Sequence, residues 1–295
     1  MRRIGLVLSA LVAVVVAAAP ARAEPLRVVA SFSILADFVR NVGGERVAVS
    51  ALVGPDGDAH VYTPTPADAK GVATADVVIV NGLGFEGWLD RLIKSAGRKT
   101  PAVVATKGIA PRKQADAHGH DADPHAWQSV ANAKIYVANI RDALSAADPA
   151  GATSYQANAA AYLARLDALE REVREAVMRV PAERRKVIST HDAFGYFAAA
   201  YGLEFIAPQG VSTESEASAG DVARIIRQIK AQKIPAVFLE NVSDPRLIRR
   251  IAEETGAKIG GTLHSDALTP ENGDAPTYID LVRHNIKALT AALLS

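Results

Sequence analysis

Three histidines and one aspartate, far apart in the chain, have the residue types and the placement of a metal-binding set. His60, His125, His191 and Asp266 follow one another at intervals of 65, 66 and 75 positions, so no local metal motif joins them. Each lies in a loop at the expected carboxyl edge of a predicted sheet, where open α/β folds bind ligands. Three imidazoles and one carboxylate complete a tetrahedral zinc shell at about 2.0 to 2.2 Å. Singly, each histidine is better explained as a surface or hydrogen-bonded residue, but their shared placement predicts one metal site.

Short apolar segments that alternate with amphipathic segments must position these residues. The pattern predicts two βα series and therefore two largely parallel sheets with helices on both faces. In the first series the predicted strands are 26–30, 47–53, 76–80 and 102–105, and the predicted helices are 33–42, 66–74, 85–96 and 129–146. In the second series the predicted strands are 187–190, 203–206, 236–240 and 257–260, and the predicted helices are 193–201, 221–232, 245–254 and 276–294.

One long amphipathic segment, 153–180, separates the two series. It contains no proline or glycine, and its roughly 28 residues would span about 42 Å as a helix. A surface helix of a single lobe is the alternative, but Pro181 ends the segment where the second series begins, which favours a stiff connector between two lobes. The expected division is a signal peptide at 1–23, an N-terminal α/β lobe at 24–152, a linking helix at 153–180 and a C-terminal α/β lobe at 181–295.

The first 23 residues have the pattern of an export signal. Arg2 and Arg3 precede an apolar run, and Ala21-Arg22-Ala23 is a small-x-small cleavage sequence. The run is shorter than the roughly 20 apolar residues that a membrane span requires. The chain has no cysteine and a net charge of +1, which disfavours a lipid anchor, disulfides and nucleic-acid binding. We therefore expect a soluble periplasmic protein without a lipid anchor.

Several segments around the candidate ligands jointly resemble the zinc/manganese-type, TroA-like solute-binding proteins (cluster A-I) of bacterial ABC importers. The resemblance covers nearly the whole chain after the signal and is carried by residues 54–64, 123–127, 190–197 and 263–266. A further segment, 209–218, looks like the exported zinc-binding, AztC-type members. The resemblance implies two lobes joined by one rigid helix, with a buried ion between them.

The resemblance also implies a role for each candidate residue and a set of partners. The four ligand positions of the family map onto His60, His125, His191 and Asp266. Manganese-type members usually have glutamate at the third position, where this chain has His191, and a nitrogen-rich set favours Zn²⁺ over Mn²⁺ as cargo. The implied partners of this expected monomer are a membrane permease with its ATPase and, as a further candidate, a periplasmic metallochaperone. A manganese-specific protein of the same type remains the alternative.

Other chemistry-bearing features have competing interpretations. His118 and His120 could collect zinc weakly and pass it inward, or they could simply be solvated. Glu240 and His264 could replace a ligand or orient one, although structural roles are favoured for both, and His284 is expected at the surface. The Gly-x-Gly-x-x-Gly spacing at 82–87 matches a dinucleotide-binding turn but lacks the expected downstream acid.

Two rival functions use the same donor set. A zinc hydrolase needs a coordinated water and a general base, and four protein ligands leave no position for that water. A binding protein for a metal chelate, or an adhesin, would use these side chains to contact something larger. The sequence therefore predicts metal capture without catalysis.

Overall fold

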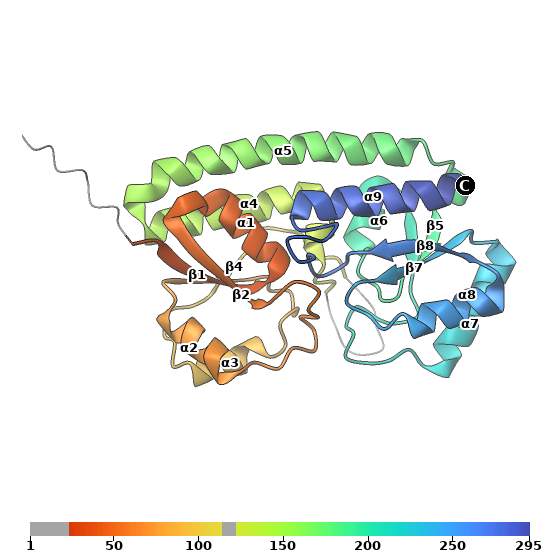
Figure 1. The fold of residues 1–295 in the computed structure, drawn as a ribbon, viewed down its shortest axis with the longest axis horizontal. Helices are drawn as coiled ribbons and strands as arrows, with labels where there is room; N and C mark the ends of the chain where they lie inside the picture. The colour runs from red at the N-terminus through yellow and green to blue at the C-terminus, as the bar shows by residue number, and fades with distance from the viewer. Residues whose placement is uncertain (1–23, 114–121) are drawn as a thin grey trace, which may run out of the picture.

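The computed structural model describes residues 24–113 and 122–295, which form two α/β lobes side by side (Figure 1). The first lobe contains a parallel sheet with strand order β2-β1-β3-β4. Its strands are β1 (Leu26–Phe32), β2 (Val47–Val53), β3 (Val77–Val80) and β4 (Val103–Val104). The central strand β3 is buried along its whole length, as expected for a parallel strand covered on both faces.

The second lobe repeats this plan with a parallel sheet of order β6-β5-β7-β8. Its strands are β5 (Lys186–Ile188), β6 (Glu204–Ile206), β7 (Ala236–Glu240) and β8 (Lys258–Leu263). The predicted fold class, two mostly parallel sheets flanked by helices, is confirmed. Residues 1–23, the predicted signal, lie outside the described residues, and no helix in the described part combines the length and the apolarity of a membrane span.

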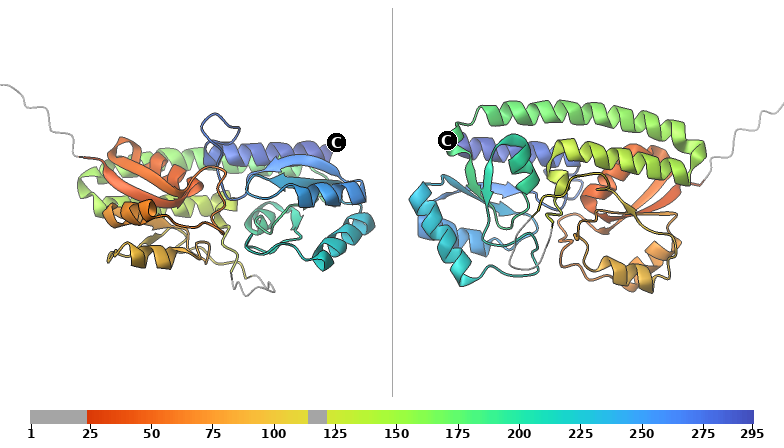
Figure 2. Two further views of the ribbon diagram at one scale, coloured as in Figure 1. Left: turned by 60° about the horizontal axis from the view of Figure 1, so that its bottom comes forward. Right: turned by 180° about the vertical axis from the view of Figure 1, so that it is seen from behind.

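Helices cover both faces of each sheet (Figure 2). Those of the first lobe are α1 (Ser33–Gly43), α2 (Pro66–Thr74), α3 (Leu89–Ser95) and α4 (Val130–Ala147). Those of the second lobe are α6 (Gly195–Tyr201), α7 (Ala219–Gln232), α8 (Arg246–Thr255) and α9 (Tyr278–Leu294). Local sequence fixes several helix starts: Thr65 and Asp68 form a capping box at α2, and Ser218 caps α7.

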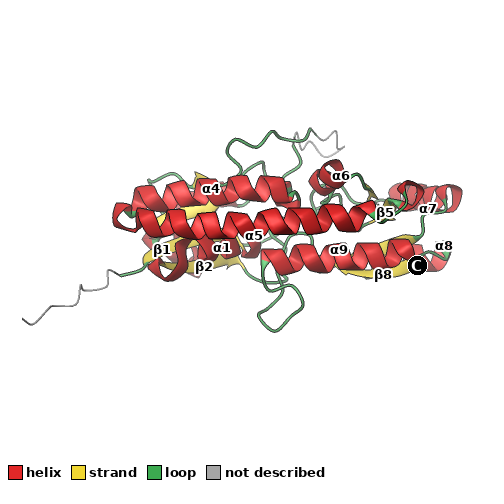
Figure 3. Cartoon of the chain, turned by 90° about the horizontal axis from the view of Figure 1, so that it is seen from above, coloured by secondary structure: helices red, strands yellow, loops and turns green. Residues whose placement is uncertain are grey.

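The long helix α5 (Ala152–Met178) runs over both lobes (Figures 1 and 3). It packs against α1 and α4 of the first lobe and against α6 and α9 of the second. Its buried face carries Tyr162, Leu166 and Leu169, spaced as one stripe of an amphipathic helix. One continuous hydrophobic core therefore includes residues from both lobes and from α5.

The start of α9 also ties the second lobe to the first. The Phe38 ring of α1 lies 4.7 Å from the ring of Tyr278 and 6.3 Å from that of Tyr162, measured between centroids. The backbone amide of Tyr278 donates to the buried carboxylate of Asp37 at 3.0 Å, and the Tyr162 hydroxyl donates to the same oxygen at 3.4 Å. Two helices, α5 and α9, therefore span the junction of the lobes.

Strand β8 (Lys258–Leu263) extends beyond its predicted range, 257–260, and contains a bulge. Val237 pairs with Ile259, but Leu239 pairs with Thr262, so β8 contains one extra residue. Gly261, with φ of 125°, lies at this irregularity. The Gly260-Gly261 pair resembles a turn in sequence, yet the strand continues to Leu263, and Asp266 follows its carboxyl end.

Candidate metal centre

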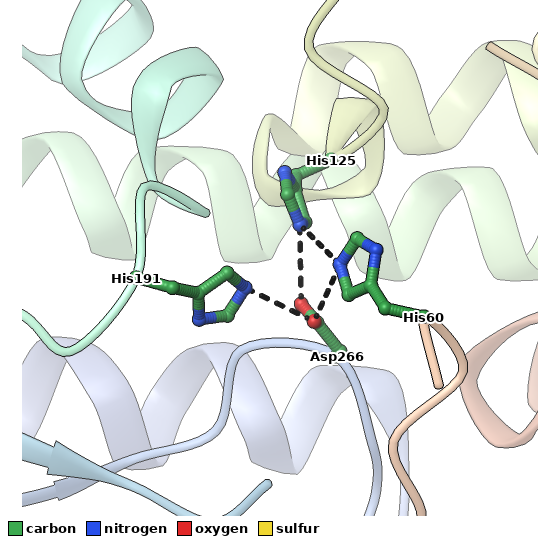
Figure 4. A group of neighbouring side chains, drawn as sticks. All are labelled: His60, His125, His191 and Asp266. Carbon is green, nitrogen blue, oxygen red and sulfur yellow. Dashed lines mark hydrogen bonds and ion pairs between the residues drawn. The ribbon is translucent and has the colours of Figure 1, made fainter. Parts of the chain in front are cut away.

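The four sequence-predicted residues converge at the junction of the lobes (Figure 4). His60 comes from the loop after β2 and His125 from the turn before α4, whereas His191 follows β5 and Asp266 follows β8. One potential ligand atom from each residue lies within 4.8 Å of all the others. His60 is 6% exposed and the other three are fully buried. Both lobes thus contribute to one enclosed cluster of donor atoms.

The donor atoms are spaced like the corners of a small coordination shell. The Nε2 atoms of His60 and His125 are 3.2 Å apart. Asp266 places Oδ2 at 3.4 Å from Nε2 of His60 and 3.1 Å from Nε2 of His191, and Oδ1 at 3.6 Å from Nε2 of His125. Ligands at about 2.1 Å from a tetrahedral ion lie about 3.4 Å from one another. The four residues therefore place donor atoms close enough together to coordinate one transition-metal ion.

Two carboxylates outside the cluster orient two of the rings. Nδ1 of His125 lies 2.9 Å from Oδ1 of Asp123, and Nδ1 of His191 lies 2.5 Å from Oε2 of Glu240. A carboxylate only accepts, so in each pair the ring Nδ1–H donates. Nε2 of His125 and Nε2 of His191 then face Asp266 and are the nitrogens left to bind a metal ion. A carboxylate on the other ring nitrogen commonly orients a metal-binding histidine in this way.

Several buried atoms in the cluster have no hydrogen bond in the structure: Nε2 of His191 and both carboxylate oxygens of Asp266. A buried polar atom without a hydrogen bond is costly and usually indicates a bound ion or water. Here the lone pairs of several acceptors face one another. A cation at their centre satisfies all of them at once.

The electrostatics of the cluster also favour a positive charge at its centre. Burial alone would raise the pKa of Asp266, but the neighbouring His191 and His125 hold that pKa well below its usual range. Burial alone would lower the pKa of His191, yet the negative charges of Glu240 and Asp266 raise it well above its usual value, so a metal ion that binds Nε2 displaces a proton from it. For His60, burial dominates and lowers the pKa.

The backbone beside Asp266 is held by groups from the first lobe. The indole Nε1 of Trp127 donates to the carbonyl of Ser265 at 2.9 Å, and Nε2 of Gln128 donates to the same oxygen at 2.7 Å. Trp127 also packs against the His125 ring, with centroids 5.3 Å apart. The segment that carries His125 therefore fixes the segment that carries Asp266.

Two further hydrogen bonds connect the lobes near His60. Asp58 accepts the backbone N–H of His60 at 2.9 Å through Oδ1 and the hydroxyl of Thr213 at 2.6 Å through Oδ2. Thr213 belongs to the second lobe and to the segment 209–218 singled out from the sequence. The side-chain amide of Asn241, at the end of β7, donates to Asp56 at 3.1 Å.

The Gly-x-Gly-x-x-Gly turn has a structural use. Gly82 and Gly84 adopt positive φ, and the carboxylate of buried Glu86 accepts from the backbone amides of Asn81 at 2.6 Å and Gly82 at 3.1 Å. The hydroxyl of Ser31 donates to the same carboxylate at 2.6 Å. The donors that would bind a phosphate are therefore occupied by the protein's own carboxylate, so this turn is no nucleotide site.

Other histidines from the sequence analysis lie elsewhere. His264, two residues from Asp266, does not join the four-residue cluster: its ring contacts Asp274, and His284 is close to both. His284 is half-buried rather than a plain surface residue, and its Nε2 donates to the backbone carbonyl of Thr262. His118 and His120 lie outside the described residues.

The sequence-based predictions do not include the orienting role of Asp123. Its position two residues before His125 is the signal that could have found this role.

The orienting role of Glu240 leads to a prediction. Oε1 accepts two backbone N–H groups, of Thr190 at 2.6 Å and His191 at 3.0 Å, while Oε2 accepts from the ring. Glutamine cannot do both, because its NH₂ must face either those amides or Nδ1–H. We therefore expect Glu240→Gln to weaken zinc binding about 10- to 100-fold in competition with a chromophoric chelator. The exposed Glu175→Gln is the control, and an unchanged affinity for Glu240→Gln would contradict the orienting role.

Comparison with known proteins places this arrangement in a family. Residues 28–292 match the family described as zinc-uptake complex component A, periplasmic. The chain belongs to this family. The Treponema pallidum periplasmic zinc-binding protein TroA has the same fold, with a TM-score of 0.86 and 32% sequence identity over 92% of this chain and 99% of that one.

The relatives of this chain differ in the metal that their names state. The manganese-binding lipoprotein MntA of Halalkalibacterium halodurans is 36% identical over 271 residues, covering 92% of this chain and 89% of its own. The iron-binding protein YfeA of Yersinia pestis is 35% identical over 268 residues, covering 90% and 86%. Family membership therefore shows that the chain belongs to a class of metal-binding proteins. It does not identify which metal this chain binds, and that question depends on the chain's own ligands.

Proposed function

We propose that this protein captures a divalent transition-metal ion and delivers it to an ABC-type importer. The observation that carries the proposal is the buried cluster in which lone pairs of three imidazoles and one carboxylate face one another at 3.1 to 3.6 Å. We assign His60, His125, His191 and Asp266 as the ligands of the transported ion. We also propose the division into an N-terminal lobe at 24–152, a linking helix at 153–180 and a C-terminal lobe at 181–295.

The donor set favours zinc as the cargo. Zinc accepts four nitrogen and oxygen ligands in a tetrahedron, whereas manganese favours more oxygen ligands and a higher coordination number. Three of the four donors here are imidazoles. A manganese-specific protein of the same type is the alternative, and the names of MntA and YfeA keep it open.

A hydrolase is disfavoured by the same geometry. Catalytic zinc keeps one coordination position for water or substrate. Four protein donors at tetrahedral spacing, each at most 6% exposed, fill the shell and shield the ion from solvent. The arrangement suits holding an ion rather than catalysing a reaction on it.

We propose that the protein works in the periplasm as a monomer, exported by the segment 1–23 and without a lipid anchor. Some relatives are named lipoproteins, but this sequence contains no cysteine to which a lipid could be attached. The proposed partners are a membrane permease and, as a further candidate, a periplasmic metallochaperone.

The test is metal analysis of the protein purified from its native compartment without added metal. We expect about one zinc ion per chain, because the nitrogen-rich site selects zinc from the metals available there. Measurement of bound metals by mass spectrometry under native conditions also separates a bare ion from a chelate. Stoichiometric manganese or iron would contradict zinc as the cargo, and a metal-free protein would contradict the proposed function.

A further inference from the structure

A second group of metal-ligating side chains lies where β8, the following loop and α9 meet. It consists of His264, Asp274 and His284, and one potential ligand atom from each lies within 4.8 Å of the other two. Nε2 of His264 is 3.0 Å from Oδ1 of Asp274, and Nδ1 of His284 is 3.2 Å from Oδ2 of the same carboxylate. The loop that carries Asp274 projects from the molecule just before α9 (Figure 2). None of the three belongs to the four-residue cluster.

The fold holds the two histidines of this group in place. His264 is 3% exposed, and its backbone is fixed by Asn285 of α9, which accepts the N–H at 2.8 Å and donates to the carbonyl at 2.7 Å. The rings of His264 and His284 are in edge contact, with centroids 4.6 Å apart. Asp274 is the most exposed member, with a side chain 60% exposed, and the His284 side chain is 24% exposed. The group therefore consists of one buried and one half-buried histidine beside an exposed carboxylate.

The hydrogen bonding of His284 fixes which of its nitrogens can bind a cation. Its Nε2 lies 2.9 Å from the carbonyl oxygen of Thr262, which only accepts, so Nε2 carries the proton. In the neutral ring, Nδ1 then presents a lone pair to the carboxylate of Asp274, and two acceptors face each other at 3.2 Å. A backbone carbonyl on the far nitrogen is also the usual partner of a metal-bound histidine.

The ring of His264 faces Asp274 through Nε2, the nitrogen that would bind an ion there. Its Nδ1 is buried and has no hydrogen-bond partner in the described structure. Nε2 of His264 lies beside Oδ1 of Asp274, and Nδ1 of His284 lies beside Oδ2. Each oxygen of the carboxylate therefore faces an imidazole nitrogen.

We propose that His264, Asp274 and His284 form a second, weaker site for a divalent transition-metal ion, with water completing the shell. Two imidazoles and a carboxylate are ligands that zinc accepts, and ligand atoms around one ion lie about 3.4 Å apart, close to the observed 3.0 and 3.2 Å. An ion at this site ties the 264–277 loop to α9. The inference does not depend on the proposed transport function, because the two sites share no ligand.

The test is zinc titration of the chain after the signal, by calorimetry and by metal analysis after equilibration with excess Zn²⁺. All proteins carry His118→Asn and His120→Asn, so that those histidines add no binding. We expect two ions per chain, the second bound at least about a hundredfold more weakly than the first, because it has three protein ligands with one exposed. Asp274→Asn should weaken the second ion at least about tenfold and leave the first unchanged.

Glu271→Gln is the matched control, because it removes the same charge from the same exposed loop and should retain both ions. His284→Gln provides a second variant, and melting of the metal-free proteins reports whether each variant remains folded. Adding Asp266→Asn should weaken only the first ion, which keeps failure at one site distinct from failure at the other. A stoichiometry of one in the parent protein would mean that a proton on His284 faces Asp274 instead, and would overturn the proposal. So would a second ion retained in Asp274→Asn.

Discussion

Replacing Asp266 by asparagine is expected to lower the affinity for zinc by about two orders of magnitude. Asp266 is the only one of the four converging side chains that is a carboxylate, and each imidazole has its Nε2 within 3.1 to 3.6 Å of one of its oxygens. Asparagine keeps the size but removes the charge and one acceptor. Zinc sites bind with about 10 to 16 kcal/mol over four ligands, so one ligand contributes about 3 kcal/mol, or about a hundredfold.

This prediction is measured by competition with a chelator of known zinc affinity. The control is Asp142→Asn, because the Asp142 side chain is 66% exposed on α4 and pairs with Arg141. That variant should bind like the parent. Asp266→Asn with an affinity within about threefold of the parent would show that Asp266 is no ligand.

Replacing His191 by glutamate is expected to shift the preference from zinc toward manganese. The change exchanges one imidazole nitrogen for carboxylate oxygen, which manganese favours and zinc favours less. The ratio of manganese to zinc affinity should rise by at least about tenfold, or about 1.4 kcal/mol. Zinc can still bind more tightly in absolute terms, so both constants must be measured and their ratio compared.

The environment of His191 determines how this variant must be built. Glu240 lies against His191 Nδ1, so a glutamate at 191 would face a second buried carboxylate. The double variant His191→Glu with Glu240→Gln removes this repulsion and should show the larger shift. His191→Gln, which lacks the charge, is the control and should weaken both metals. An unchanged or lower ratio in both glutamate variants would contradict the account of the third ligand.

Periodicity and strand-end placement were sufficient to predict much of this molecule. The alternation of apolar and amphipathic segments predicted two parallel sheets, and the long segment 153–180 corresponds to α5 (Ala152–Met178). The four candidate ligands each lie beside an element end, and the structure brings their side chains together. Parallel strands direct their carboxyl ends to one edge of a sheet, so topology accounts for the placement of His60, His191 and Asp266, which follow β2, β5 and β8.

The partners of those residues depend on neighbours that sequence order does not reveal. Glu240 reaches His191 because β5 pairs with β7, although β6 lies between them in the chain. His264 and Asp266 are two residues apart and equally plausible as ligands by type. They diverge because Asn285 holds the backbone of His264 against α9, whereas the carbonyl of Ser265 is held by Trp127 and Gln128 of the first lobe. These are contacts between distant segments, which local patterns do not encode.

The most direct test of the central claim is anomalous diffraction at the zinc edge from crystals loaded with one equivalent of zinc. We predict one dominant peak about 2.0 to 2.2 Å from Nε2 of His60, His125 and His191 and from the carboxylate of Asp266, with no coordinated water. A dominant peak elsewhere would contradict the account. So would an ion at this position with fewer than four protein ligands and an open, water-bound site.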